Sequence, residues 1–355
     1  GGSGGTMVAG KKIERHELQP GEVIQVGESK LRYHLDRAGE DATLGGEHAF
    51  GRPKPQPEIA PLKDLVGQSL GSYRLDEIIS AGNSGMVFKA TDTDKDRVAA
   101  VKVLTPDITN QDEQRDRFVR AMKTMIDVRH PNLVRLLNAG KTGPYCWAAM
   151  EYIEGEDLLK VIDRLGIQGM LDWREVWRVA IHVGRALQHA QEKKIIHRNL
   201  TPTNILRRHK DKVCLVGDLM LAKALEGTLA QQVTQPGQLV GDVPYLSPER
   251  TRDGATVDGR SDIYSLGATL YALLTSKAPF ESDSLPELVT MVRTAEPARP
   301  STFQMAINEL FEDAVMRMLS KEPDDRFQTA REMMHELDRI GRHNSLEADW
   351  SGWVD

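Results

Sequence analysis

One short stretch of the sequence places the strongest constraint on the fold. Two isoleucines precede a mainly polar segment from His197 to Asn204, and the apolar residues Ile205 and Leu206 follow it. Apolar residues on both sides of a polar loop indicate a chain that leaves the core to present side chains and then returns to it. The stretch therefore predicts a functional loop that buried structure supports at both ends.

The size of the chain allows one large domain of two lobes or two ordinary domains. The sequence has 355 residues, of which 40% are hydrophobic, so it can form a sizeable core. Its net charge of −6 gives no basic stripe of the kind that nucleic-acid binding requires. We therefore expect no nucleic-acid partner.

The cysteines and the apolar runs indicate a location in a reducing compartment. Only Cys146 and Cys214 occur, both inside apolar runs, and we expect them to be small buried hydrophobic residues without a disulfide or metal. No apolar run approaches the length of a membrane-spanning helix, and the N-terminus lacks a signal-peptide pattern. These features predict a cytoplasmic chain with no membrane segment.

The first 70 residues differ in composition from the rest. Residues 1–6 have the composition of a tag-like linker, and residues 36–70 form a Pro/Gly-rich linker. Between them, the alternation of apolar and polar residues predicts a β-hairpin within 13–35. This hairpin resembles the C-terminal end of a forkhead-associated domain, and the alternative is an orphaned edge hairpin that packs on another part of the protein.

Residues 73–103 predict three strands separated by turns. Gly82 and Gly85 lie at the first turn, where glycines allow backbone N–H groups to approach phosphate oxygens. Lys102 lies on the third strand, and a buried lysine requires an anion or a carboxylate as its partner. A plain hairpin turn is an equally good explanation of the glycines taken alone.

Together these stretches are similar to the serine/threonine protein kinase family. The segment from His197 to Asn204 resembles its catalytic loop, in which an Asp accepts the proton of the substrate hydroxyl and an Asn holds a metal ion. Here Asn199 occupies the Asp position and Thr201 the position of a Lys. Because a neutral amide cannot accept that proton, the resemblance implies a phosphotransfer site without its base.

The resemblance also assigns a nucleotide site. Lys102 corresponds to the lysine that pairs with ATP phosphates, and Ser80 replaces the first glycine of the Gly-rich loop. Ala121 occupies the place of the glutamate that normally binds this lysine, so we expect Asp218 to be its nearest alternative partner. Val87, Ala100 and Leu206 correspond to residues that enclose the adenine ring, although each alone is explained equally well as a core residue. Met150, Glu151 and Ile153 correspond to the end of the last small-lobe strand and the hinge.

A carboxylate interrupts the apolar run that begins at Val213. This residue, Asp218, corresponds to the Asp of the family's Asp-Phe-Gly motif, and with Asn204 it implies a complete pair of Mg²⁺ ligands. The alternative is a structural carboxylate bonded to Lys102. Met220 replaces the glycine of the motif, which predicts one fixed conformation.

The third change in the catalytic cluster is Asp242, which replaces a threonine. We expect Asp242 to accept hydrogen bonds from the Asn199 amide and the Thr201 hydroxyl. Two alternatives remain open: the positions have drifted in an unused site, or Asp242 serves as a displaced base. Arg198 also suggests control by phosphorylation of a threonine in the activation segment, Thr228 or Thr234.

The remaining motifs predict an intact scaffold. The helix that starts at Asp262 is apolar nearly all round and therefore buried, and Asp262 is expected to bond the backbone of the catalytic loop. Glu249 and Arg326 are expected to form a buried ion pair. The tail, residues 342–355, contains Trp350 and Trp353 among acidic residues, and the alternatives are docking on this chain or a partner, or disorder.

We therefore expect an α+β protein kinase-like domain at 71–341, with a small lobe of mainly β-structure at 71–152 and a helical large lobe at 153–341. The favoured function is a pseudokinase that binds ATP with Mg²⁺ and acts on a protein partner as a scaffold or allosteric regulator. One alternative is a slow kinase, because losing a base typically costs about 10²- to 10⁴-fold in rate. The other is an interaction module without nucleotide, whose cleft is closed by Met150, Met220 and a bridge between Lys102 and Asp218.

Overall fold

The computed structural model describes residues 61–82, 84–106, 112–168, 170–219, 242–252 and 254–347, and the backbone of four short strands nearer the N-terminus. The chain divides into two compact units, Gly1–Pro57 and Glu58–Asp355. Each unit is described by itself. Met220, Thr228, Thr234 and the tail from residue 348 onwards lie outside the described residues, as do the predictions made for them.

The first unit contains a four-stranded sheet in the order β2-β1-β3-β4. Strands β3 (Val23–Val26) and β4 (Ser29–Arg32) form an antiparallel hairpin within the range 13–35. Strands β1 (Met7–Val8) and β2 (Lys11–Lys12) extend the sheet, because β1 pairs with β3. The hairpin is therefore part of a larger sheet, which a two-stranded ribbon generally needs for stability in water.

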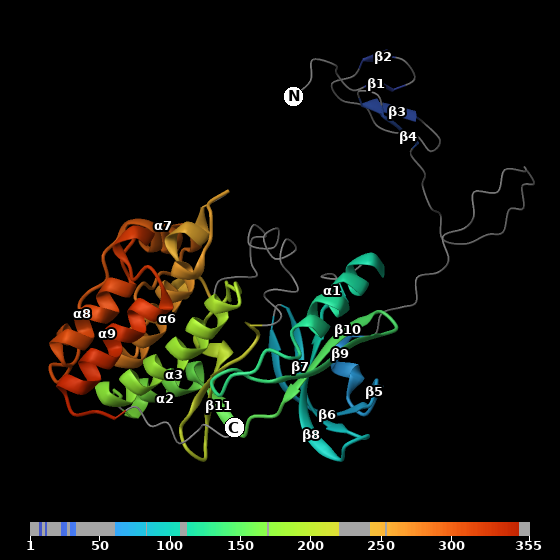
Figure 1. Ribbon diagram of the computed structural model, residues 1–355. Coiled ribbons are helices and arrows are strands. Elements are labelled where there is room, and N and C mark those ends of the chain that lie inside the picture. The colour runs from blue at the N-terminus through green and yellow to red at the C-terminus, as the bar shows by residue number, and fades with distance from the viewer. Residues whose placement is uncertain are drawn as a thin grey trace, which may run out of the picture. The chain divides into compact units, whose positions relative to one another are not determined.

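The small lobe of the second unit is an antiparallel sheet of six strands with the helix α1 (Asp112–Thr124) packed on it (Figure 1). The strand order is β5-β6-β7-β8-β10-β9. In chain order the strands are β5 (Ser69–Leu70), β6 (Tyr73–Gly82), β7 (Gly85–Asp92), β8 (Arg97–Leu104), β9 (Leu136–Thr142) and β10 (Tyr145–Glu151).

The strand register separates the two faces of this sheet. Val87 pairs with Lys102, and Ala100 pairs with Met150, so these four side chains lie on one face. The side chains that alternate with them point to the opposite face and form a separate apolar cluster, which includes Phe88, Ala90, Ala99, Val101 and Val103. The sheet therefore has one face of packed core and one face that carries the lysine.

The predicted linker ends earlier than expected. Residues 62–65 form the short 3-10 helix η1 (Leu62–Leu65), and β5 follows at residue 69, so the prediction of linker to residue 70 is wrong. Leu65 is only 1% exposed and joins the apolar cluster on the outer face of the sheet. Gly71 has φ of 60°, and a Cβ at this position would lie 2.9 Å from the Trp147 ring, which explains the glycine. The Pro/Gly-rich composition of this segment gave no sign that Leu65 and Leu70 pack on the sheet.

The large lobe is formed mainly by helices, with a small sheet in the order β11-β12-β13 (Figure 1). Its strands are β11 (Gly155–Asp157), β12 (Ile205–Arg208) and β13 (Cys214–Val216). Its α-helices are α2 (Leu158–Gln168), α3 (Trp173–Glu192), α6 (Gly259–Thr275), α7 (Leu285–Thr294), α8 (Glu309–Met318) and α9 (Ala330–His343). Short 3-10 turns join them: η3 (Pro202–Asn204), η4 (Val243–Tyr245), η5 (Pro248–Thr251), η6 (Pro300–Thr302) and η7 (Pro323–Asp325).

Local sequence signals position these helices. Asp172 accepts a hydrogen bond from the Arg174 N–H at 2.8 Å and caps α3. The Asp157 carboxylate likewise accepts from the Lys160 N–H at 2.9 Å at the start of α2. Helix α6 is buried along nearly its whole length, which confirms the central helix predicted from its apolar sequence.

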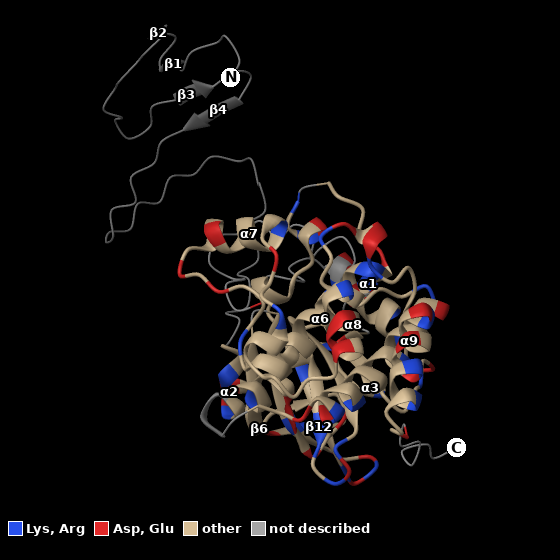
Figure 2. Cartoon of the chain, turned by 90° about the vertical axis from the view of Figure 1, so that its left-hand side faces the viewer, with Lys and Arg blue, Asp and Glu red and all other residues tan. Residues whose placement is uncertain are grey.

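The main core includes residues of both lobes. Phe118 of α1 and Cys146 of β10 belong to the same apolar cluster as α3, α6 and α9 of the large lobe. Cys146 and Cys214 are both buried, which confirms the prediction that they lie in the core. Among the described residues, no helix is both long enough and apolar enough to span a membrane. Lysine and arginine are interspersed with aspartate and glutamate over the outer helices (Figure 2).

Candidate functional site

The predicted functional loop is held by Asp262 at the start of α6. Its two carboxylate oxygens accept hydrogen bonds from the backbone N–H groups of His197 and Arg198, at 2.7 and 2.8 Å. This confirms the role predicted for Asp262. Arg198 has φ of 63°, so the loop turns sharply at this point and the bonds to Asp262 stabilise the turn. Burial raises the pKa of Asp262, while the neighbouring His197 and Arg250 oppose this effect.

Backbone and side-chain bonds also join the loop to the segment that follows β13. A nitrogen of the His197 ring lies 2.8 Å from the Gly217 carbonyl oxygen, and the Gly217 N–H donates to the Asn204 carbonyl at 2.7 Å. The Asn204 side-chain amide donates to the Asn199 carbonyl at 2.8 Å. Because this bond uses the nitrogen of the Asn204 amide, its oxygen remains available as a ligand for a cation.

The strand lysine is paired with the carboxylate predicted as its alternative partner. Lys102 Nζ lies 2.5 Å from Asp218 Oδ2, and the lysine is buried. Ala121 on α1 is half-buried and packs on the main core, so α1 offers no carboxylate at the position that the resemblance indicates. Asp218 has φ of 56°, a left-handed conformation that aspartate tolerates better than most residues. The pair joins the two lobes through a single contact between charged groups.

The residues predicted to contact an adenine ring are half-buried, and three of them lie on the same sheet face as the lysine. Val87, Ala100 and Met150 share the face of the small-lobe sheet that carries Lys102. Leu206 comes from β12 of the large lobe and is also half-buried, as is Ile153 in the connection between the lobes. These apolar residues leave part of their surface uncovered, as the walls of a ligand site require.

The connection between the lobes is fixed at Glu151. Its carboxylate accepts a hydrogen bond from the Arg135 N–H at 2.7 Å, and its own N–H donates to the Arg135 carbonyl at 2.9 Å. The side chain of Glu151 therefore has a structural partner. Its backbone carbonyl is then the group of this residue that could contact the base of a nucleotide.

The Gly-rich turn has a structural explanation at one of its glycines. Gly82 pairs with Gly85 at the end of the β6–β7 hairpin, and Gly85 has φ of 149°. A Cβ on Gly85 would lie 2.1 Å from the Val103 carbonyl oxygen of the neighbouring strand. Close packing of strands therefore requires Gly85. Gly82 has no atom within 4 Å of such a position and remains the better candidate for an approach to phosphate.

The sequence interpretation missed Ile79 as a candidate. It is 40% exposed and lies where the β6–β7 register shifts, immediately before the pairing of Ser80 with Val87. A large apolar side chain left exposed beside Val87 is a candidate contact for a flat aromatic ligand. The signal that could have found it is an apolar residue directly before the Gly-rich turn.

The network predicted around Asp242 is not the one that forms. The Thr201 hydroxyl lies 2.8 Å from the Thr203 hydroxyl, and no hydrogen bond joins Asp242 to Asn199 or Thr201, all three of which the structure describes. Thr201 is buried and makes its bond within its own turn, so the prediction is wrong. Burial raises the pKa of Asp242, although the positive charges of Arg250 and Lys102 oppose the increase. Asp242 therefore lies within electrostatic reach of the lysine.

The ion pair predicted in the large lobe is confirmed. Arg326 donates to both carboxylate oxygens of Glu249, at 2.8 Å each, and both residues are buried. The Ser261 hydroxyl also donates to Glu249. Burial alone would raise the pKa of Glu249, but the bonds and charge of Arg326 together with the Ser261 bond lower it to about 2. These bonds hold together three segments of the large lobe, those of Glu249, Ser261 and Arg326.

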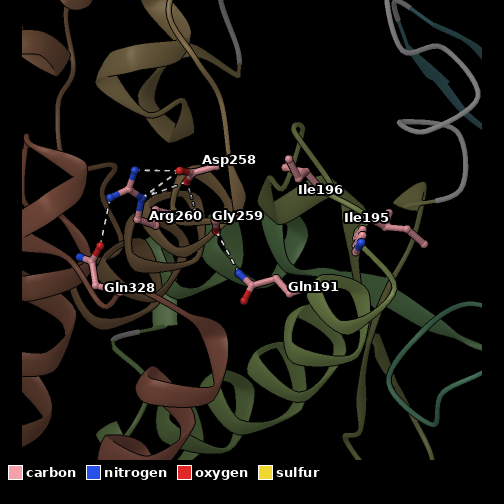
Figure 3. A pocket seen from close by; sticks show the side chains of 8 residues that line it. Gln191, Ile195, Ile196, Asp258, Gly259, Arg260 and Gln328 are labelled. Atoms are coloured by element: carbon pink, nitrogen blue, oxygen red, sulfur yellow. Dashed lines mark hydrogen bonds and ion pairs between the residues drawn. The ribbon is translucent and has the colours of Figure 1, made fainter.

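A separate pocket of about 360 Å³ lies on the large lobe, where the end of α3 meets the start of α6 (Figure 3). Several of its polar groups bond to each other: Arg260 binds Asp258 and the Gln328 side-chain oxygen, and Gln191 donates to the Gly259 carbonyl. Because these groups already have partners, few remain for a ligand. We therefore place the candidate site in the cleft of Lys102 and Asp218.

Comparison with known proteins agrees with this architecture. The family model described as protein kinase domain matches residues 73–337. The serine/threonine-protein kinase PknB of Mycolicibacterium smegmatis is 34% identical over 280 residues, which are 78% of this chain and 44% of that protein. Serine/threonine-protein kinase pkn3 of Myxococcus xanthus is 33% identical over 287 residues, covering 79% of this chain and 52% of pkn3. The chain thus spans about half the length of these relatives, or less.

Solved structures give the same result. The PknI kinase domain of Mycobacterium tuberculosis is 26% identical, with a TM-score of 0.60, and the match covers 77% of this chain and 98% of that domain. The matched length corresponds to the two lobes described above. The two-lobed fold and the matches over three quarters of the sequence together show that this chain belongs to the protein kinase domain family, with serine/threonine-protein kinases among its relatives.

Proposed function

We propose that this chain is a pseudokinase domain that binds ATP with Mg²⁺ and regulates a protein partner as a scaffold or allosteric element. The observation that carries the proposal is the set of residues where the lobes meet: Lys102 lies 2.5 Å from Asp218, and the Asn204 amide oxygen stays available, while Asn199 replaces the catalytic acid. The contact between Lys102 and Asp218 alone also agrees with the alternative that binds no nucleotide, and the thermal-stabilisation test separates the two. The groups that bind a nucleotide are retained, whereas the group that would accept the substrate proton is an amide.

The residues present fit a nucleotide and its metal. Asp218 and the amide oxygen of Asn204 are hard oxygen ligands of the kind that Mg²⁺ takes. Bound Mg²⁺ would neutralise part of the charge of the phosphates. Lys102 would bind phosphate oxygens, and Val87, Ala100 and Leu206 would enclose the base. Lys102 must exchange Asp218 for phosphate, so we expect nucleotide affinity to be moderate.

A role in regulation agrees with this arrangement. Binding that breaks the contact between Lys102 and Asp218 changes an ion pair that joins the small lobe to the large lobe. A ligand that favours one arrangement of the lobes can thereby change the affinity of a protein for the surface of either lobe. The partner would be a protein, in a cytoplasmic signalling pathway.

The first test is thermal stabilisation by ATP with and without Mg²⁺. We expect a rise in melting temperature that depends on Mg²⁺ and that is lost in Asp218→Asn and Lys102→Met. The control is Lys95→Met in the exposed turn between β7 and β8, which should respond as the wild type does. Equal response of all four proteins to ATP would contradict nucleotide binding in this cleft.

A second candidate, a slow kinase, is favoured by the surroundings of Asp242. Its pKa is raised by burial, which improves a carboxylate as a base, and it makes no bond to Asn199 or Thr201 that would occupy it, each of these residues being described. Transfer of labelled phosphate from ATP to a generic protein acceptor distinguishes the two functions. Transfer that is lost in both Asp218→Ala and Asp242→Asn would establish the kinase, and no transfer by the wild type would support the pseudokinase.

A further inference from the structure

The large lobe exposes two apolar side chains on one loop that the cleft does not use. Met305 is 95% exposed and Phe303 is 42% exposed, both in the connection between α7 and α8. No other large apolar side chain in the described ranges of the chain is as exposed as Met305. We call these two residues the loop patch. Exposed apolar side chains on a soluble protein are frequently the contact surface for another segment or molecule.

The loop patch stands on a rigid base. The 3-10 turn η6 precedes it, and the Glu312 carboxylate of α8 accepts a hydrogen bond from the Ser301 N–H at 2.6 Å. Arg299 donates to the same carboxylate at 2.7 Å, and the Phe303 N–H donates to the Pro300 carbonyl at 3.0 Å. The base of the patch is thus fixed by charged and backbone bonds, so its two apolar side chains are held in place for a partner.

The chain leaves helix α9 directly beside this loop. Asn308, which follows the loop patch and caps α8, donates from its side-chain amide to the Asn344 side-chain oxygen at 3.0 Å. The Leu346 N–H donates to the Gly341 carbonyl at 2.9 Å, and Leu346 packs on the edge of the main core, as Ile307 does. The residues that follow Leu346 therefore start within a few residues' reach of the loop patch.

The sequence after Leu346 has the chemistry to cover the patch. Trp350 and Trp353 alternate with small and acidic residues. Because a residue spans at most about 3.5 Å, Trp350 lies within roughly 14 Å of Leu346 and Trp353 within roughly 25 Å. Arg342, exposed at the end of α9, carries a positive charge that would attract the tail's acidic residues.

From these observations we infer that residues 349–355 dock on the loop patch of the same chain, with an indole ring of Trp350 or Trp353 against Met305 and Phe303. Indole rings bury a large apolar area and form favourable contacts with the sulfur of methionine. The docked tail would cover the patch until a partner with a comparable apolar side chain displaces it.

Acrylamide quenching of tryptophan fluorescence in the full chain tests this inference. Trp147, Trp173 and Trp177 are buried, so the quencher reports mainly on Trp350 and Trp353. We expect the tail indoles to be protected relative to a free peptide of residues 345–355. Met305→Glu should lower the ratio of docked to undocked tail by roughly tenfold or more, because one large apolar contact is lost. Met170→Glu, which changes an exposed methionine before α3, is the matched control and should have no effect.

Hydrogen exchange of residues 299–308 provides a second measurement that does not depend on fluorescence. We expect faster exchange in the double variant Trp350→Ala, Trp353→Ala than in the wild type. Quenching of the wild-type tail at the rate of the free peptide would overturn the inference. Protection that increases with protein concentration would also overturn it, because it would place the tail on a second copy.

Discussion

Two pairs of opposite charges in this molecule differ in the number of their other partners. In the large lobe, Arg326 binds both oxygens of Glu249 and also donates to three backbone carbonyls, those of Arg260, Ser320 and Lys321. In the cleft, Lys102 and Asp218 have only each other as hydrogen-bond partners among the described side chains. A buried charge with all its bonding positions filled holds a scaffold, whereas a charge with one partner can exchange that partner for a ligand.

The difference explains why the family resemblance is uneven along the chain. Glu249, Arg326 and Asp262 keep the expected residue types, and removing any of them would leave a buried charge or backbone group without a partner. Ala121, Asn199 and Asp242 depart from the pattern of the family at positions that are only half-buried. A change at such positions costs less stability, so the chemistry of the site can change while the fold is kept. Thr201 is a further departure and is buried, but its hydroxyl forms a hydrogen bond with the Thr203 hydroxyl.

The largest expected effect comes from breaking the fully bonded pair. Arg326→Met would leave Glu249 buried and unpaired, and we expect it to lower the free energy of unfolding by about 3 to 5 kcal/mol. Denaturant titration followed by circular dichroism measures this. Arg339→Met, which removes an exposed pair with Glu336, should cost about 0 to 1 kcal/mol. Equal losses in the two variants would remove the distinction between scaffold and cleft.

The pair in the cleft should show the opposite behaviour. Lys102→Met is expected to change the free energy of unfolding little, because it removes one pair that is open to solvent at Asp218, but to weaken ATP binding by about 1.5 to 3 kcal/mol. Isothermal titration with ATP and Mg²⁺ measures the affinity, and Lys95→Met serves as the exposed control. Strong destabilisation with unchanged affinity would show that Lys102 is part of the scaffold.

A pH titration separates the contribution to stability of the Glu249–Arg326 pair from that of the contact between His130 and His189. The rings of His130 and His189 stack with their centroids 5.1 Å apart. Burial lowers the pKa of His130 from 6.5 to about 4, and the charges of His189 and Arg185 add to this effect. The charge of Glu192 opposes it. The folded protein therefore binds this proton less readily than the unfolded chain does. Stability from neutral His130 is complete above pH 6.5 and is lost as the pH falls towards 4.

We expect protonation of His130 to lower the free energy of unfolding by about 1 to 2 kcal/mol, allowing for the partial exposure of the ring. The contribution of Glu249, whose pKa is about 2, should persist until the pH falls below its unfolded value of 4.5. Unfolding curves at pH 7 and pH 5 test the first change, and His130→Asn should flatten the difference. If the free energy of unfolding decreases only below pH 4.5, the sensitivity to acid comes from the carboxylates alone.

The smallest expected effect comes from restoring the missing carboxylate. Ala121→Glu would offer Lys102 a second partner and free Asp218 for Mg²⁺, so we expect ATP affinity to rise by about two- to fivefold, or roughly 0.5 to 1 kcal/mol. Ala121→Gln is the control that has nearly the same size without the charge. An equal rise in both variants would show that packing of α1, rather than charge, limits binding.

Much of the fold follows from local sequence. The cap residues Asp157 and Asp172 mark the starts of two helices, and the apolar sequence after Asp262 predicts the buried helix α6. These signals are local, since each depends on a few neighbouring residues. The linker boundary was missed because Leu65 and Leu70 are isolated leucines whose role depends on a sheet formed later in the chain.

The candidate site was predicted in part. The exchange of Lys102's partner from a helix carboxylate to Asp218 was expected, because the sequence shows no acid at position 121. The bonds expected of Asp242 were wrong, because the Thr201 hydroxyl instead forms a hydrogen bond with the Thr203 hydroxyl within its own turn. Ile79 was missed because its exposure arises from an irregular strand register.

The order of the motifs, the helix starts and the lack of a carboxylate at positions 121 and 199 can all be predicted from the sequence, because they depend on residue identity and short-range periodicity. The distances between side chains that are far apart in the sequence are set only by the folded chain. Lys102 and Asp218 are 116 positions apart, and only the packing of the two lobes brings them to 2.5 Å. Hydrogen bonds and ion pairs fall off steeply with distance, so their partners are fixed by the folded geometry.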